Sequence, residues 1–204
     1  MGVPVTASVE TVELPSDSFL GRVYINKPAF RADGILVLNR VKKHTDIHGE
    51  IESGMLKMIA IGLGNVRQAE ALHANGLDYL KKSIPVAARE IIRRGKIFHG
   101  LGIVENAYGE TAVIAGAAPA EMETVEKALL KKSKKWTAGL PVRDVDVLVI
   151  DRGGKDISGS CIETNVIGRM NLRGETELRS PRVKRIVVSD LSDKSQGNAA
   201  GIGL

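Results

Sequence analysis

The segment "GILVLNRVKKHTDIHGEIESGMLKMIAIGLG" (residues 34–64) decides the fold expected of this chain. Residues 34–41 form a short, β-branched apolar run, which predicts a buried strand. After a polar connection, residues 55–61 form a second apolar run without strict alternation, which predicts a buried helix that ends at Gly62 and Gly64. A strand followed by a helix is the repeating unit of an α/β protein.

The same alternation extends in both directions from this segment. The other expected strands cover residues 21–26, 96–106, 110–119, 144–151 and 183–192, and the other expected helical segments cover residues 27–32, 66–75, 77–95 and 120–136. We therefore predict an α/β fold with a mostly parallel or mixed sheet and flanking helices. The turn-forming sequence "GLP" near residue 140 predicts a boundary between two domains, residues 1–140 and 141–204. The second should be an α/β domain that begins with a buried strand near residue 144.

Two of these helices carry specific expectations. The helix at 66–75 should begin on an Asn65 cap, with Val66, Ala69 and His73 on one face. The helix at 77–95 should kink or restart before Pro85, because proline lacks the N–H that a helix interior requires.

The amino-acid composition favours a globular protein without membrane-spanning segments or disulfides. The chain has 204 residues, 43% of them apolar, which is enough to bury a core, and only 3% are aromatic, so Val, Ile, Leu and Ala must fill that core. No apolar run is long enough to span a membrane, and the N-terminus lacks the order of a signal peptide, so we expect a cytoplasmic protein. The single cysteine, Cys161, excludes an internal disulfide, and any metal must bind histidine or carboxylate.

The net charge of +5 raises the question of a nucleic-acid partner. The lysines and arginines lie in short clusters along the sequence. Some of these clusters fall at expected helix C-termini, where positive charge complements the helix dipole. No aromatic residue is interleaved for base stacking, so nucleic acid is not the expected partner.

Several residues of the 34–64 segment and the helix after it could carry chemistry. Lys57 sits in an apolar run, where it is either a desolvated nucleophile or a side chain that extends to water. His44 and His48 are four residues apart, a spacing that suits a metal only on a helix. His73 is either a structural histidine or a ligand. The Gly62 region could cradle a phosphate, although the fuller glycine motif is absent.

Outside this segment, Lys155 follows the strand expected at 144–151. It could bind a substrate carboxylate, or it could pair with Asp151 and Asp156 in an ordinary turn.

The stretch "ADGILVLNRVKKHTDIHGEIESGMLKMIAIGLGNVRQAEALH" resembles the lactate racemase family, whose members use a nickel pincer nucleotide. The resemblance is to a less characterised branch of lactate racemase domain proteins. It continues through "HGLGIVENAYGETA", "DVDVLVID", "GKDISG", "NVIGR" and "VSDLSDKSQGNAAGIGL", and so covers nearly the whole chain.

The resemblance implies roles for individual residues. Lys57, which follows the turn that contains Gly54, would bind the cofactor through a thioamide, and His73, sixteen positions later, would ligate nickel. His44 would act as acid and base on the hydroxyl of a small 2-hydroxy acid, although its interval to Lys57 is longer than in the racemase and His48 lies in the same loop. Lys155 would face the substrate.

The resemblance also implies a racemase or epimerase in its full-length form. The family's second base and arginine-bearing segment precede the part matched here, so we expect this chain to be a fragment that needs its flanking segments for turnover. Two alternatives remain: a binding or scaffold protein that keeps the fold without the cofactor, and a phosphate- or nucleotide-binding protein.

Overall fold

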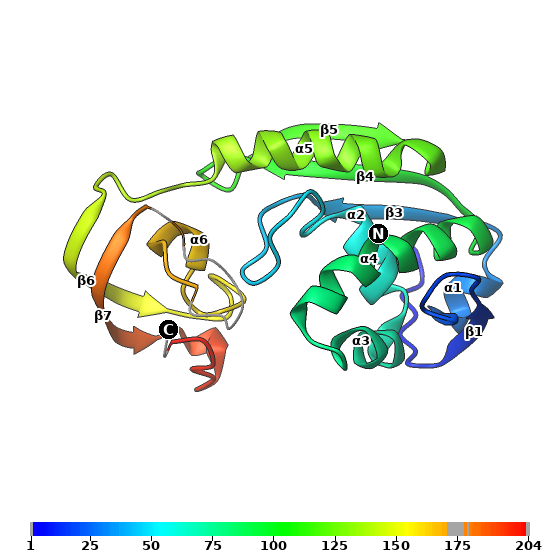
Figure 1. Cartoon of the computed structure of the whole chain (residues 1–204), viewed down its shortest axis with the longest axis horizontal. Helices are drawn as coiled ribbons and strands as arrows, with labels where there is room; N and C mark the ends of the chain where they lie inside the picture. The colour runs from blue at the N-terminus through cyan, green and yellow to red at the C-terminus, as the bar shows by residue number, and fades with distance from the viewer. Residues whose placement is uncertain (1, 171–177, 179, 203–204) are drawn as a thin grey trace. The chain divides into compact units, whose positions relative to one another are not determined.

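A computed structural model describes residues 2–170, 178 and 180–202 (Figure 1). The chain divides into two compact units, Met1–Trp136 and Thr137–Leu204. Both contain helices and strands; the first has parallel and antiparallel pairs and the second a parallel pair, so the predicted α/β class with mixed sheets is confirmed. No helix among the described residues is long and apolar enough to cross a membrane.

The sheet of the first unit has the strand order β3-β4-β5. Strand β3 (Ile35–Arg40) pairs in parallel with β4 (Ile97–Glu105), and β4 pairs antiparallel with β5 (Thr111–Ala117). A separate antiparallel hairpin of β1 (Thr11–Pro15) and β2 (Arg22–Asn26) precedes it. Strand β1 is absent from the sequence-based assignment.

Most helices of the first unit come between β3 and β4 in the sequence. After the short α1 (Lys27–Arg31) and β3, the chain forms α2 (Met55–Lys57), the π-helix η1 (Met58–Gly62), α3 (Asn65–His73) and α4 (Leu77–Arg94). A 3₁₀ turn, η2 (Pro119–Glu121), leads into α5 (Met122–Trp136) after β5. The apolar run at 55–61 is therefore helical as predicted, but its second half is wound with the wider π turn.

Glycines in β4 allow the helices to pack closely on the sheet. A Cβ on Gly100 would lie 2.8 Å from the sulfur of Met55, and one on Gly102 would lie 2.4 Å from Cδ1 of Leu129. Met55 and Leu129 come from α2 and α5, and both are buried. The strand thus holds the short helix that carries Lys57 against the core.

The α3 helix differs from its prediction. Its N-cap is Gly64, while the Asn65 side chain instead donates from Nδ2 to the Ser8 carbonyl at 3.1 Å. Its buried residues are Gln68 and Leu72, each of which precedes a residue of the predicted face, Ala69 and His73, by one position. Gln68 is buried because its Oε1 accepts the Tyr24 backbone N–H of β2 at 2.6 Å.

The predicted restart in the next helix is wrong, since α4 runs unbroken through Pro85. Tertiary packing overrides the local cost of the proline: Ile84, Ala87, Ala88 and Ile91, on both sides of it, are buried.

The second unit contains a parallel pair of strands, β6 (Asp144–Gly153) and β7 (Arg182–Leu191). The short helix α6 (Thr164–Ile167) lies in the connection between them, and a 3₁₀ turn, η3 (Asp193–Ser195), follows β7. Residues 171–177, in the connection between these two strands, lie outside the described residues. The prediction of a buried strand at 144–151 is wrong, because Val147 and Val149 are 50% and 63% exposed.

Candidate functional site

Lys57 and His44 meet at the carboxyl end of strand β3. Lys57 is the last residue of α2, and His44 lies in the loop that joins β3 to α2. The Lys57 Nζ and the His44 Nε2 are in hydrogen-bond contact, and both side chains are partly buried. Two residues that sequence reasoning considered separately are therefore brought together by the fold.

The hydrogen bonds of His44 define which of its nitrogens carries the proton. Its Nδ1 accepts the backbone N–H groups of Asp46 at 2.9 Å and Ile47 at 3.1 Å. An Nδ1 that accepts cannot be protonated, so the neutral imidazole carries its hydrogen on Nε2. The Nε2–H then donates to Lys57, which can accept only as a neutral amine with a free lone pair.

The surroundings of Lys57 and His44 also favour the neutral form of each side chain. Burial, followed by the charge of a protonated Lys57, lowers the pKa of His44 from 6.5 to about 4 against the opposing charges of Asp46 and Glu52. Burial also lowers the pKa of Lys57 below its ordinary value; Asp46 opposes that shift and Lys42 adds to it. Both residues are thus biased towards their neutral forms, in which the amine is nucleophilic.

A cavity of about 290 Å³ opens beside Lys57. Its polar lining consists of Asn39, Arg40, Lys42, Ser53 and Lys57, and one side of η1 supplies the rest. Ligands of α/β proteins commonly bind at the carboxyl ends of parallel strands, which is where this cavity lies.

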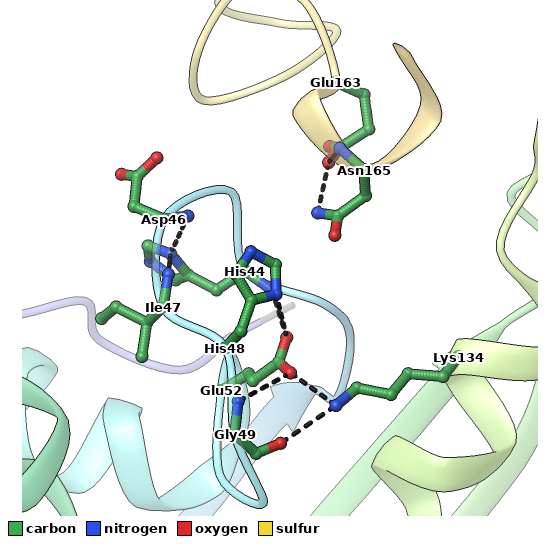
Figure 2. Close-up of polar contacts among 9 residues, drawn as sticks. All are labelled: His44, Asp46, Ile47, His48, Gly49, Glu52, Lys134, Glu163 and Asn165. Atoms are coloured by element: carbon green, nitrogen blue, oxygen red, sulfur yellow. Dashed lines mark hydrogen bonds and ion pairs between the residues drawn. The ribbon is translucent and has the colours of Figure 1, made fainter. Parts of the chain in front are cut away.

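Glu52 holds the loop that presents His44 (Figure 2). Its carboxylate is only 1% exposed and accepts the backbone N–H groups of His44 at 2.9 Å and Gly49 at 3.2 Å. Lys134 of α5 lies 2.6 Å from Oε1 of Glu52 and also donates to the Gly49 carbonyl at 2.9 Å. One buried, paired carboxylate therefore fixes the loop from the inside.

The base of the same loop is closed by backbone contacts. Lys42 and Ser53 exchange two hydrogen bonds, of 2.9 and 3.2 Å. The Asn39 side chain, at the end of β3, donates to the Gly54 carbonyl at 2.8 Å, so the strand end and the start of α2 are tied directly.

His48, the alternative acid/base residue in the loop, faces Glu52 rather than Lys57. Its Nδ1 lies 3.9 Å from Oε2 of Glu52, and its buried Nε2 has no hydrogen-bond partner among the described residues.

Glu126 caps the helix that carries Lys57. This side chain of α5 is fully buried, and its Oε2 accepts the Leu56 backbone N–H at 2.8 Å. Burial raises the pKa of Glu126 to about 7, against the opposing effect of the hydrogen bonds from Leu56 and Met55. Gly54 is needed for this arrangement, since a Cβ there would lie 2.4 Å from the Glu126 carboxyl carbon.

His73, the predicted nickel ligand, ends α3 and is exposed. Its Nδ1 bonds to the Ala69 carbonyl at 2.6 Å, and because a carbonyl only accepts, this nitrogen is the protonated one. Nε2 then keeps its lone pair, the arrangement that metal-ligating histidines use. His73 is not among the residues that line the cavity beside Lys57.

Lys155, the predicted substrate residue, belongs to the second unit. Its ammonium donates to the Gly159 carbonyl at 2.6 Å within its own loop, and its backbone N–H donates to the Ser195 hydroxyl at 2.8 Å.

Glu52 and Glu126 are the residues that sequence reasoning missed. A signal for Glu126 was present, because it falls between Met122 and Leu129 on the inward face of the predicted helix at 120–136. The sequence contains no comparable signal for Glu52, whose partners on α5 are distant along the chain.

No group of three or more histidine, cysteine or acidic side chains that could hold a metal ion occurs among the described residues. No family model matches the chain, and no curated protein matches it.

Proposed function

We propose that this chain is part of a nickel-pincer-dependent 2-hydroxy acid racemase or epimerase, with Lys57 as the covalent attachment point of the cofactor. The observation that carries the proposal is the contact between Lys57 and a His44 whose Nδ1 already accepts two backbone N–H groups. This arrangement favours a neutral lysine amine, which is the form required for bonding to a thiocarboxyl or carbonyl carbon.

The chemistry of Lys57 and of His73 suits such a cofactor, although His73 does not line the cavity beside Lys57. Lys57 would hold it through its amine nitrogen, and His73 would offer the lone pair of Nε2 to the nickel, since its Nδ1 is bonded to the Ala69 carbonyl. A single protein ligand is what the resemblance implies, so a cluster of several ligands is not required. When bound, the group would supply a hydride acceptor for the carbon that carries the substrate hydroxyl.

His44 would act on the substrate as a proton donor at Nε2. The backbone N–H groups of Asp46 and Ile47 keep Nδ1 unprotonated, so only Nε2 can exchange a proton with the substrate oxygen. To act as a base, the imidazole must carry its proton on Nδ1, with loss of the two backbone hydrogen bonds there, so that Nε2 has a free lone pair. Lys155 would bind the substrate carboxylate only after its ammonium leaves the Gly159 carbonyl.

The test is to co-express the chain with the biosynthetic enzymes of the pincer cofactor and to measure its intact mass and bound nickel. We expect a mass increase that peptide mapping assigns to Lys57, with about one nickel per chain. The Lys57→Arg variant should show neither, and the Lys43→Arg variant should behave as the parent.

A mass increase on lysines in general, or a modified Lys57 without nickel, would contradict the proposal. An unmodified Lys57 under these conditions would favour the second candidate, a scaffold domain that keeps the fold without the cofactor. Turnover is tested separately, by incubation of the nickel-loaded protein with a panel of 2-hydroxy acids.

A further inference from the structure

The cavity beside Lys57 is strongly cationic. Arg40, Lys42 and Lys57 line it, whereas no acidic residue does. Asn39 and Ser53 add polar groups at its edge. Arg40 and Lys42 are charged, whereas the Lys57 amine is neutral, and two cations in a lining without a carboxylate produce a positive potential that attracts anions.

The two outer cations retain donors for a ligand. Glu105 pairs with Arg40 only through Nη1, at 3.0 and 3.2 Å, which leaves Nη2 and Nε of the guanidinium fork. Lys42 is exposed, and its ammonium has no ion pair with an acidic side chain among the described residues. Arginine and lysine donors of this kind bind carboxylates and phosphates.

We propose that this cavity binds a small carbonyl compound through its anionic group, a carboxylate or a phosphate held by Arg40 and Lys42, and that an unmodified Lys57 forms an imine with its carbonyl carbon. This proposal rests on the neutral Lys57 amine of the proposed function, but it requires neither nickel nor the pincer cofactor. At about 290 Å³ the cavity has room for a compound of a few carbon atoms, since one water-sized group occupies roughly 30 Å³ of liquid.

The chemistry uses only groups that are present. The Lys57 nitrogen attacks the carbonyl carbon and forms a C–N bond as the C=O π bond breaks, and one of the two amine protons moves to the oxygen, which becomes a hydroxyl. His44 donates its Nε2 proton to that hydroxyl, which leaves as water, and recovers a proton from the nitrogen as the C=N bond forms. No electrons are exchanged, and the net change is one water lost for each imine.

The experiment traps the imine in the chain produced without any cofactor-synthesising enzymes. The protein is incubated with glyoxylate, glycolaldehyde phosphate or neutral glycolaldehyde in the presence of cyanoborohydride, which reduces the imine to a stable amine. Peptide mapping by mass spectrometry then measures the rate of labelling at each lysine. The two anionic probes distinguish a carboxylate ligand from a phosphate ligand.

We expect Lys57 to be labelled first, and at least one anionic probe to react about tenfold faster than glycolaldehyde, equivalent to about 1.4 kcal/mol of binding by the anion. Inorganic phosphate should compete with that probe. Lys42→Gln should remove most of the preference, whereas Lys43→Gln, the same charge change outside the cavity lining, should keep it. Unchanged melting temperatures will show that both variants fold.

Three results would overturn the proposal: labelling spread evenly over surface lysines, equal rates for the charged and neutral probes, or equal losses in the two variants. Trapping at Lys57 in a chain that never binds nickel would refute the racemase proposal alone. Nickel and cofactor on Lys57 without any anion preference in the unmodified chain would refute this one alone.

Discussion

At the residue scale, the most informative feature is the direction of one hydrogen bond. Two backbone N–H groups occupy Nδ1 of His44, so the proton between His44 and Lys57 belongs to the imidazole. The lysine is therefore prepared as a nucleophile without a carboxylate base, by burial and by a neighbour that can only donate.

This arrangement predicts an unusual pH profile for acylation of Lys57. Acetic anhydride at a trace level should label Lys57 with a midpoint pH below the ordinary pKa of a lysine, because burial lowers the Lys57 pKa. In His44→Ala the amine becomes more hydrated, so the midpoint should move upward. Quantitative peptide mapping across pH measures it, with His48→Ala as the control in the same loop; a midpoint that does not respond to His44→Ala would contradict the assignment.

The raised pKa of Glu126 leads to a separate prediction, that the free energy of unfolding depends on pH. Its pKa is raised to about 7 in the folded chain, so the folded state holds a proton that the unfolded state releases near the ordinary value of 4.5. Its contribution to stability is therefore full below about pH 4.5 and is lost as pH rises through 7, by about 3 kcal/mol in total.

Urea unfolding of the parent and of Glu126→Gln, from pH 5 to 8, tests this prediction. The free energy of unfolding of the parent should fall relative to the variant over that range. The difference between the two proteins isolates Glu126, because His44, whose pKa is lowered, acts in the opposite direction and is common to both. A constant difference across the range would show that Glu126 does not titrate there.

At the element scale, α2 depends on a cap supplied by another helix. Gly54 has an extended backbone with a φ of −179°, which any residue can adopt, so its role is to leave room for Glu126 rather than to permit a special conformation. Gly54→Ala should cost about 2–4 kcal/mol, through displacement of the buried carboxylate and loss of its bond to Leu56.

Gly49→Ala is the matched control, because the nearest atom to a Cβ there is 3.8 Å away. Chemical denaturation of both variants measures the costs. If the two substitutions cost the same, Gly54 has no special steric role. The combination of Gly54→Ala with Glu126→Ala should cost less than the sum of the single changes, since both remove the same contact.

The loop between β3 and α2 should depend in the same way on Glu52. Glu52→Ala leaves the His44 and Gly49 amides without their acceptor and Lys134 without its partner, at a cost of about 2–4 kcal/mol. Tryptic cleavage after Lys42 or Lys43 should become faster. Glu50→Ala, which removes an exposed ion pair with Lys127, should change stability by no more than about 0.5 kcal/mol and leave cleavage slow.

The sequence predicted most of these elements but not how they are capped and paired. The apolar runs located β2, β3, β4, β5 and α5, because burial of a strand or helix face leaves a local periodicity. Glu126 shares the inward face of α5 with Met122 and Leu129, but this period does not indicate its partner Leu56, which is distant along the chain. Glu52 follows no such period, and its ion-pair partner Lys134 is also distant along the chain. Lys57 and His44 were singled out by residue type and resemblance, whereas their direct contact depends on the loop closure that Glu52 provides.

At the scale of the whole molecule, the chain consists of two compact units, and the boundary between them in the sequence falls between Trp136 and Thr137. The first unit contains two hydrophobic core clusters, and α5 contributes Met122 to one of them and Leu129 and Leu130 to the other. Residues 1–136 should therefore fold alone and unfold cooperatively, with a melting temperature close to that of the same unit in the full chain.

Residues 1–118, which lack α5, are the control and should not fold, since they lose the Glu126 cap and the buried side chains of Met122 and Leu129. Circular dichroism and calorimetry of the two truncated proteins measure this. Loss of cooperative unfolding in residues 1–136 would mean that the second unit is needed for stability.

The π-helix η1 places a constraint on how this sequence can change over evolutionary time. A π turn arises when one residue is inserted into an α-helix, and such insertions persist mainly where they serve a function. Deletion of a single residue between Met58 and Gly62 would restore an ordinary α turn and rotate Lys57 by about 100° relative to α3, away from its present neighbours. Homologous sequences that lack this residue should therefore be under no selection to keep a lysine at the position of Lys57. In an alignment, a gap at this position would mark the homologues that have lost the chemistry of Lys57.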